Sequence, residues 1–373
     1  MTSNQRLPTS LTPLDVALGS LLRGIEPVTS RELPLAEALR CVAAEMPPLH
    51  AYPPHDVAAV DGFAFRARDL VGASSYTPLP LVSSPAWVEA GDKIPENCDC
   101  VLDADCADPT GPLFQVLAEA IPGQGVRRAG GDIAEGTLLA EAGRRVQPRD
   151  LLIARAAGVE EINVRRPRLR IVNIPGGAIT ANLIAETARA AGAEVLFAEA
   201  MSRDATAVAD VLDADCDLLV TIGGSGVGRT DSTIAALAKR GEVIAHGIAL
   251  QPGRTSAIGK IGTVPLVALP GAPDQALAAW WTVVLPVLDR LSGLQQRRPV
   301  SLPLARKIAS QVGVAEIALL ERNDASFVPL AIGDLPLQII ARADAWLVVP
   351  AGSEGFAAGT RVDAYMLRER AIR

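Results

Sequence analysis

The residues of this chain best suited to chemistry form a glycine-rich turn, GGSGVG, at residues 223–228. Four glycines in six residues let backbone N–H groups approach an anion closely, and a helix after the turn would add the positive end of its dipole. The turn lacks both the context of a dinucleotide-binding G-x-G-x-x-G and the lysine of a Walker loop. It predicts a cradle for a phosphate or a pterin, with a tight structural turn as the alternative. The candidate contacts are Gly223, Gly224, Ser225, Gly226 and Gly228.

Other short segments place charged or turn-forming residues where they could join this cradle. Asp231, three residues after the last glycine, could cap the next helix or hold a cation. Arg254, in the turn QPGR, suits a phosphate or an oxyanion such as molybdate, unless it is simply solvated. Pro270 and Gly271 directly follow the apolar stretch PLVAL. Asp61 precedes a glycine and an alternating apolar segment, which as a lone motif is typical of a hairpin turn.

From residue 168 onward, apolar runs alternate with stretches of helical spacing. Strands are predicted at residues 169–174, 194–197, 217–222 and 265–269, and helices at 182–191, 205–212, 233–239 and about 274–291. This alternation predicts a parallel sheet with helices on both faces, and in such sheets ligands bind beyond the carboxyl ends of the strands. The glycine turn and the Pro270-Gly271 turn both fall at that edge.

The remaining segments predict smaller domains. Residues 11–22 have helical spacing, residues 51–130 are short apolar stretches broken by Pro and Gly, and residues 300–373 suggest strands separated by turns. We therefore expect a multidomain α/β protein: a doubly wound, mostly parallel sheet, a β-rich inserted domain and a small all-β C-terminal domain. The expected boundaries are 1–50 plus 131–166 for an N-terminal linking domain, 51–130 for the insert, 167–293 for the sheet domain and 297–373 for the C-terminal domain.

Composition and charge exclude several classes of protein. The chain has 373 residues, of which 49% are hydrophobic and 21% charged, so it is globular rather than disordered. Its net charge of −7 and its scattered basic pairs argue against a nucleic-acid partner. It has neither the apolar core of a signal peptide near residue 1 nor an uninterrupted apolar run of about 20 residues. We expect a cytoplasmic protein that does not enter a membrane.

Cysteine and histidine spacing gives little support for a metal site. Cys98, Cys100 and Cys106 lie close together, but C-x-C-x5-C is not a zinc pattern. An odd total of five cysteines without a secretion signal argues against a disulfide framework. We expect buried structural thiols, and the three scattered histidines are expected in loops or at the surface.

Taken in order, several motifs resemble the molybdopterin molybdenumtransferase family, of the MoeA and gephyrin E-domain type. PPHDVAAVDGFAFRARDL is similar to the family's segment around Met-Asp-Gly-Tyr-Ala, and VRRAGGDIAEG to its Arg-Gly-Glu-Asp-Ile segment. DLLVTIGGSGVGRTD resembles its Thr-Gly-Gly-Val-Ser-Val-Gly-Asp-Tyr-Asp loop. QPGRTSAIGKIGTVPLVALPGAPDQA resembles its Lys-Pro-Gly-Lys-Pro and Leu-Pro-Gly-Asn-Pro loops, and the likeness spans nearly the whole chain.

This resemblance implies an elongated homodimer of four-domain subunits, with the active site between the sheet domain of one subunit and the inserted domain of the other. It implies hydrolysis of adenylylated molybdopterin with Mg²⁺ and placement of molybdate on the dithiolene, giving molybdenum cofactor. Position by position, the catalytic acids would be Asp61, Asp204 and Asp231, with Asp61 and Asp231 as Mg²⁺ ligands. The pterin or anion contacts would be the turn glycines, Ser225, Arg254, Pro270 and Gly271.

The chain departs from the family pattern at several of these positions. The family's acidic Thr-Gly-Asp-Glu-Leu loop is replaced by IPGGAI at residues 174–179, which removes a carboxylate pair. A lysine of the family is Gln251, the serine of its glycine loop is Gly226, and the first acid of that loop is Arg229. A threonine of the inserted domain falls near Ala90. These changes shift the charge offered to an anionic substrate.

Three hypotheses follow. The first is molybdate insertion into adenylylated molybdopterin, as a Mg²⁺-dependent transferase. The second is a catalytically impaired relative that binds molybdopterin or the finished cofactor and delivers it, with a molybdoenzyme client as a partner. The third is a structural homodimer without a ligand.

Overall fold

The computed structural model describes residues 5, 7–8, 10–110 and 112–368. Its contacts divide the chain into two compact units. The first contains the residues up to Ala44, Ala142–Val146 and the residues from Asn163 onward. The second contains Glu45–Glu141 and Gln147–Ile162, so it is inserted into the first.

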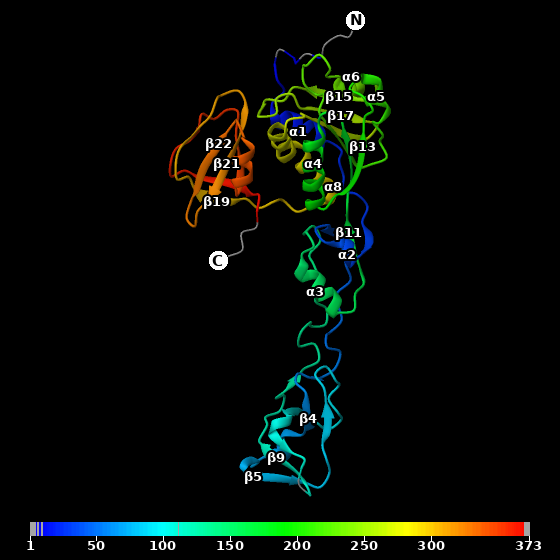
Figure 1. Ribbon diagram of the computed structural model, residues 1–373, viewed down its shortest axis with the longest axis vertical. Coiled ribbons are helices and arrows are strands. Elements are labelled where there is room, and N and C mark those ends of the chain that lie inside the picture. Colours follow the sequence, from blue (N-terminus) through cyan, green and yellow to red (C-terminus); the bar gives the residue numbers. More distant parts are fainter. Residues whose placement is uncertain (1–4, 6, 9, 111, 369–373) are drawn as a thin grey trace. The chain divides into compact units, whose positions relative to one another are not determined.

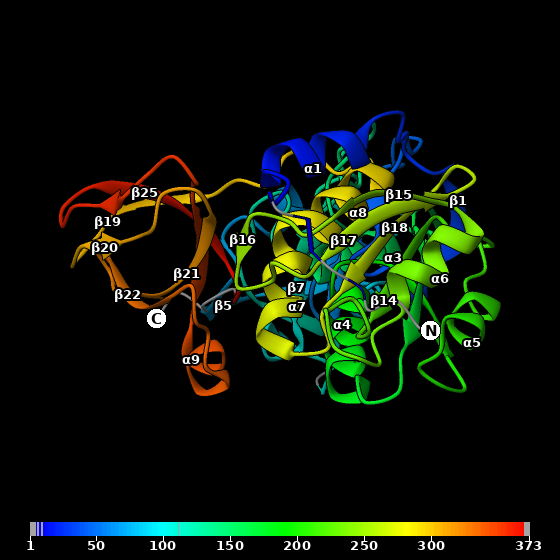
Figure 2. The same ribbon diagram turned by 90° about the horizontal axis from the view of Figure 1, so that it is seen from above.

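A six-stranded sheet forms the centre of the first unit (Figures 1 and 2). Its strand order is β13-β12-β14-β18-β17-β15, and the first four strands are parallel. Those four were predicted: β12 (Arg168–Asn173), β13 (Glu194–Glu199), β14 (Leu218–Ile222) and β18 (Val264–Leu269). The sequence did not predict the antiparallel extension by β17 (Ala257–Ile261) and β15 (Glu242–His246).

Helices cover both faces of this sheet, which confirms the doubly wound fold. Successive side chains of a strand point to opposite faces, so Ile171 packs in one core cluster and Val172 in the other. The first cluster includes α1 (Leu14–Leu22), α4 (Ala178–Ala190), α7 (Pro273–Ala279) and α8 (Leu285–Ser292). The second is formed with α5 (Ala205–Asp210) and α6 (Thr233–Arg240).

The long apolar helix expected at residues 274–291 is interrupted by a π-helical segment, η3 (Trp280–Val284), between α7 and α8. Pro286, in the first turn of α8, has no N–H and would crowd a regular α-helix four residues earlier. Trp280 and Trp281 of this segment lie in the core, where they are 2% and 6% exposed.

The strands after α8, joined by β16 from earlier in the chain, form a β-structure within the first unit, with strand order β16-β21-β23-β25-β19 and β22 on β21. The expected all-β character needs one correction, because the helix α9 (Leu337–Arg342) follows a turn that begins after β22. Trp281 of η3 stacks on Trp346 of β23 at a centroid distance of 5.5 Å. The strands are β16 (Leu250–Gln251), β19 (Val300–Pro303), β20 (Ile308–Ala309), β21 (Ala315–Arg322), β22 (Phe327–Ile332), β23 (Ala345–Val349), β24 (Gly355–Phe356) and β25 (Arg361–Met366).

A small sheet in the first unit joins segments that precede and follow the insert. Its order is β1-β11-β2, with β1 (Arg31–Pro34), β2 (Val42–Ala43) and β11 (Glu161–Arg165). The short helix α2 (Leu35–Ala38) lies between β1 and β2 in the chain.

The second unit is rich in short strands, as predicted for the insert. Two three-stranded sheets have the orders β6-β4-β7 and β5-β9-β8, and β10 pairs with β3. Gly62 is required in β4, because a Cβ there would lie 2.1 Å from the carbonyl oxygen of Leu102. The elements are β3 (Val57–Ala58), β4 (Gly62–Phe65), η1 (Ala67–Leu70), β5 (Ser74–Leu81), β6 (Ala86–Val88), β7 (Cys100–Asp103), η2 (Ala104–Cys106), β8 (Ala107–Asp108), β9 (Phe114–Ala118), β10 (Val126–Arg127) and α3 (Pro148–Ala156).

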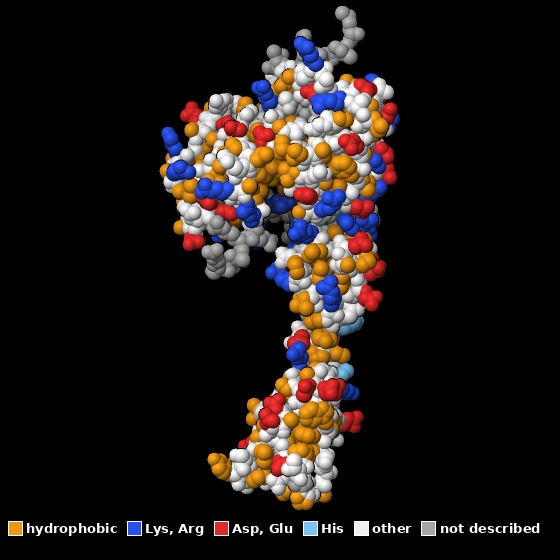
Figure 3. Space-filling view, viewed as in Figure 1, with side chains coloured by type: hydrophobic (Ala, Val, Ile, Leu, Met, Phe, Trp, Pro, Cys, Tyr) orange, Lys and Arg blue, Asp and Glu red, His pale blue; other side chains and the backbone are white. Residues whose placement is uncertain are grey.

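The surface drawn in Figure 3 carries charged side chains of both signs. On the face drawn in Figure 3, Lys and Arg side chains are interspersed with Asp and Glu. Among the helices of the described residues, none is long and apolar enough to span a membrane.

Candidate functional site

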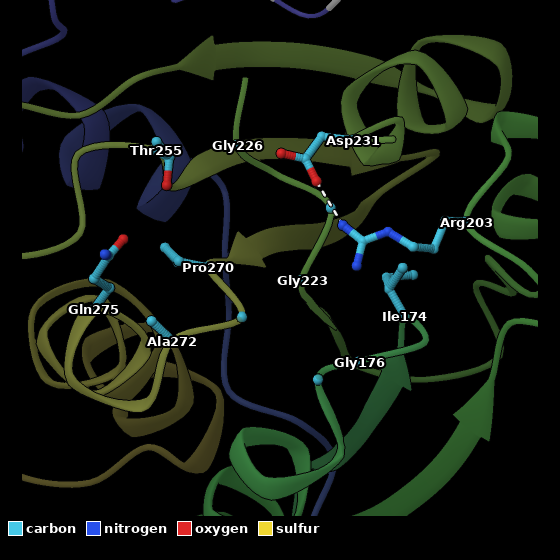
Figure 4. Close-up of a pocket in the computed structure, with 13 residues that line it drawn as sticks. Ile174, Gly176, Arg203, Gly223, Gly226, Asp231, Thr255, Pro270, Ala272 and Gln275 are labelled. Atoms are coloured by element: carbon cyan, nitrogen blue, oxygen red, sulfur yellow. Dashed lines mark hydrogen bonds and ion pairs between the residues drawn. The ribbon is translucent and has the colours of Figure 1, made fainter. Parts of the chain in front are cut away.

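A pocket of about 290 Å³ opens at the carboxyl ends of three neighbouring parallel strands (Figure 4). Ile174 follows β12, Gly223 follows β14 and Pro270 follows β18, and each lines the pocket. This is the edge at which doubly wound sheets bind ligands. The lining residues are Ile174, Gly176, Gly177, Arg203, Gly223, Gly224, Gly226, Asp231, Thr255, Pro270, Gly271, Ala272 and Gln275.

The glycine turn takes a conformation that side chains disfavour. Gly223 and Gly224 have φ values of +92° and +67°. The Thr233 side chain donates to the carbonyl oxygen of Gly223 at 2.9 Å, and its backbone N–H donates to that of Gly224 at 3.1 Å. A Cβ on Gly224 would lie 2.4 Å from Thr233 Oγ1. The turn is therefore fixed against the start of α6.

Two side chains distant in sequence also hold this turn. The Gln5 amide nitrogen donates to the carbonyl oxygens of Gly224 and Gly226 at 3.0 and 2.9 Å, and its oxygen accepts from Ile234 N at 2.8 Å. His246 Nε2 lies 2.9 Å from the carbonyl oxygen of Ser225. The sequence reasoning missed both residues, and it expected the first N–H groups of α6 to face the ligand. The Gln5 oxygen already accepts from two of them, Ile234 N at 2.8 Å and Ala235 N at 3.4 Å.

The charged side chains of the pocket are Asp231 and Arg203. Asp231 Oδ1 accepts from Arg203 Nη2 at 2.7 Å, and Oδ2 accepts from Gly228 N at 2.9 Å. Arg203 Nη1 also donates to the carbonyl oxygen of Pro175 at 3.0 Å. Sequence reasoning missed Arg203, which lies next to Asp204 at the N-terminus of α5 and carries no motif of its own.

Of the residues predicted as pterin or anion contacts, Gly223, Gly224, Gly226, Pro270 and Gly271 line the pocket. Ser225 and Gly228 belong to the same turn but lie outside the lining, and Ser225 is fully buried. Arg254 is exposed and does not line the pocket, whereas its neighbour Thr255 does. The roles of all these residues stay predictions.

The structure shows where the residues that depart from the family pattern lie and what they contact. Ile174, which stands where the resemblance leads one to expect an acidic loop, lines the pocket but is only 1% exposed. Gln251 donates to the carbonyl oxygen of Gly333 at 3.1 Å and so contacts the C-terminal β-structure. Arg229 is exposed.

The predicted catalytic residue Asp204 caps α5. Its carboxylate accepts from Thr206 N and Ala207 N, both at 3.0 Å, and from the Ser202 hydroxyl, and these bonds lower its pKa. It is exposed and does not line the pocket.

We expect Asp204→Ala to lower the melting temperature at neutral pH and Asp204→Asn to leave it nearly unchanged, since Asn caps helices well. Because the folded-state pKa is lowered, the stabilisation is present above the unfolded pKa of about 4 and is lost as pH falls through the folded pKa. Thermal melts of both variants from neutral to acidic pH test this. A fall in turnover in a fully stable Asp204→Asn variant would instead support the catalytic role.

The third predicted acid, Asp61, lies in the second unit. It is exposed, and its Oδ1 accepts from Ala90 N at 2.7 Å. Ala90 lines a separate pocket of about 250 Å³ within this unit, beside the ion pair of Arg127 and Asp132 at 3.0 Å. Among the described residues, no group of three or more His, Cys, Asp or Glu side chains is placed to hold a metal ion.

All five cysteines are free thiols, but only Cys41, Cys100 and Cys216 are fully buried; Cys98 and Cys106 are half-buried. Burial raises the pKa of both Cys100 and Cys216 to about 11.

At pH 8 a thiol with such a pKa is only about 0.1% thiolate, and the thiolate is the reactive form. We expect iodoacetamide to leave Cys100 and Cys216 unlabelled in the native protein and to label them fully after denaturation. Mass spectrometry of digests at both conditions measures this, with half-buried Cys106 as the comparison within the same sample. Equal native labelling of Cys100 and Cys106 would contradict it.

Two family models match the chain. One, for the MoeA N-terminal region (domain I and II), matches residues 12–158, and the other, "Probable molybdopterin binding domain", matches residues 179–290. The chain belongs to the MoeA family. The pocket residues from Ile174 to Gly177 precede the second match, and the remaining pocket residues fall inside it.

Relatives of this MoeA-family chain extend over most of its length. It is 27% identical to molybdopterin molybdenumtransferase 2 of Mycobacterium tuberculosis, over 94% of this chain and 97% of that protein. It is also 27% identical to the molybdopterin molybdenumtransferase of Haemophilus influenzae, over 76% and 78% of the two chains. The fold matches the molybdopterin biosynthesis MoeA protein from Pyrococcus horikoshii, with a TM-score of 0.68, 22% identity, and coverage of 96% and 100%.

Proposed function

We propose that this protein acts in molybdenum cofactor biosynthesis and inserts molybdate into molybdopterin. The observation that carries the proposal is the pocket at the carboxyl ends of β12, β14 and β18, lined by the glycine turn and the Pro270-Gly271 turn. It lies where a doubly wound sheet binds its ligand. Full-length relatives named as molybdopterin molybdenumtransferases support the same function.

The backbone of the pocket suits the phosphate of a pterin ligand. Gly223 and Gly224 remove side chains from the turn, so a ligand can reach the main chain. α4 begins at the pocket with Gly177 as its N-cap and without a side-chain cap, so its positive end is available to an anion. Ala272, which is partly exposed at the pocket wall, supplies apolar surface for the flat ring system.

The finer predictions belong to the proposal as well. They are an adenylylated form of molybdopterin as substrate, a homodimer, a cytoplasmic location, a molybdoenzyme client and a requirement for Mg²⁺. The Mg²⁺ requirement fits the donors of this pocket poorly. Among the described lining residues Asp231 is the one carboxylate, and it already binds Arg203 and Gly228 N.

The transferase is tested by mixing purified protein with molybdate and molybdopterin, either free or adenylylated, and measuring molybdenum cofactor formed over time. We expect turnover by the native protein, a loss of about tenfold or more in Asp231→Ala, and native rates in Asp324→Ala, whose side chain is exposed on the C-terminal β-structure. Tight binding without turnover would support the carrier hypothesis, which the relatives do not favour. If the protein did not bind molybdopterin at all, the hypothesis of a structural homodimer without a ligand would remain.

A further inference from the structure

Arg203 brings a positive charge into the pocket. Among the described lining residues it is the one cation, and Asp231 is the one anion. Their ion pair at 2.7 Å leaves the side chains of the pocket without net charge. The uncapped start of α4, which follows Gly176 beside Arg203, then adds a partial positive charge. The electrostatic potential of the pocket therefore favours an anion even without a bound metal ion.

Asp231 is poorly placed to receive a divalent cation. One carboxylate oxygen accepts from Arg203 and the other from Gly228 N, and the side chain is only 15% exposed. Gly226 and Gly228 crowd it further, since a Cβ on either would lie 2.6 or 3.0 Å from Oδ2. A metal ion bound to Asp231 would stand beside the guanidinium and be repelled by it.

The loop that replaces the family's acidic segment contacts Arg203. Pro175 accepts a hydrogen bond from Arg203 Nη1 at 3.0 Å. Gly176, with a φ of +98°, lies beside that nitrogen, and a Cβ there would be in ordinary van der Waals contact with it at 3.4 Å. The arginine side chain is 38% exposed, so hydrogens on its two terminal nitrogens remain for a ligand. A planar guanidinium held in this way binds phosphate oxygens in a fixed geometry.

We propose that Arg203 serves as the cation of this pocket in place of a divalent metal, so that the protein binds the phosphate of molybdopterin without Mg²⁺. This rests on the proposed function and names a residue that binds the substrate. Two differences from the family pattern then act together. The carboxylates that would bind a metal ion are absent, and the guanidinium of Arg203 supplies the positive charge that the metal ion would have supplied.

The test is a set of binding titrations with molybdopterin under anaerobic conditions, each done in EDTA and again with excess Mg²⁺. For the native protein we expect equal dissociation constants in the two buffers. Arg203→Ala should weaken binding in EDTA by about tenfold or more, and Mg²⁺ should recover part of the loss because Asp231 Oδ1 no longer accepts from Arg203. Arg203→Lys keeps the positive charge but loses the paired N–H donors of the guanidinium. It should bind molybdopterin more weakly than the native protein does, and still independently of Mg²⁺.

Arg298→Ala is the matched control, since Arg298 is an exposed arginine in the linker before β19. It should bind like the native protein, and melting curves of all variants confirm that they fold. Native binding that appears only with Mg²⁺, or unchanged binding by Arg203→Ala in EDTA, would overturn the role of Arg203 and leave the proposed function standing. Failure of the native protein to bind molybdopterin in either buffer would overturn both.

Discussion

Replacing Gly224 by alanine is expected to weaken molybdopterin binding by about tenfold or more. The residue has a φ of +67°, which costs a non-glycine residue about 1–2 kcal/mol. The new Cβ would also lie 2.4 Å from the Thr233 hydroxyl oxygen. Thr233 is fully buried and uses that hydroxyl to bind Gly223, so it cannot turn away without losing a buried hydrogen bond. The turn must move instead, and with it the backbone that faces the pocket.

Isothermal titration measures this effect, and Gly262→Ala is its matched control. Gly262 has a similar φ of +59°, but it lies between β17 and β18 and nothing comes within 4 Å of an added Cβ. The control therefore carries the backbone strain without the collision, and it should lose some stability but no affinity. Native affinity in a folded Gly224→Ala protein would show that the turn does not contact the ligand.

Trp280→Ala is expected to destabilise the first unit by about 3–5 kcal/mol. The indole is 2% exposed and packs in the core cluster that joins α1, α4, α7 and α8 to the sheet. Its removal leaves a cavity at the π-helical segment, where the backbone is already irregular and Pro286 limits its adjustment. The loss is a large part of the stability of an ordinary domain.

Chemical denaturation followed by circular dichroism gives the free energy of unfolding. Leu337→Ala is the control, because this large side chain is 61% exposed on α9 and should change stability by about 0.5 kcal/mol or less. If the free energy of unfolding of Trp280→Ala lay within about 1 kcal/mol of the native value, as for a surface substitution, the core would have repacked to fill the cavity.

The strands and helices of the sheet domain could be predicted because their pattern is local. DLLVTI and PLVAL are continuous apolar runs of strand length, and each is fully or nearly fully buried in β14 and β18. β15 and β17 escaped prediction because EVIAH begins and ends with polar residues and is only partly buried, and because AIGKI contains a glycine and an exposed lysine. The interruption of the long helix was visible only as Pro286, a single residue in an otherwise helical run.

For the site, sequence reasoning found the backbone turns but not the side chains that hold them. Clusters of glycine and proline directly after an apolar run indicate turns, so the lining turns at residues 223–226 and 270–271 were recognisable. Arg203 and Gln5 act through contacts 28 and more than 200 residues away in the chain, and no local pattern encodes such contacts. Arg254 was favoured over Arg203 because it stands in a turn that resembles a family motif, yet Arg203 lines the pocket.

The insertion of one compact unit into the other constrains how the chain folds during synthesis. Residues up to Ala44 leave the ribosome first, but their partners come much later: β2 pairs with β11, and Thr12 pairs with Ile248. The whole second unit, up to Ile162, is translated before β11 is complete. The insert can therefore fold completely during synthesis, before the strands that pair with the residues up to Ala44 have been translated.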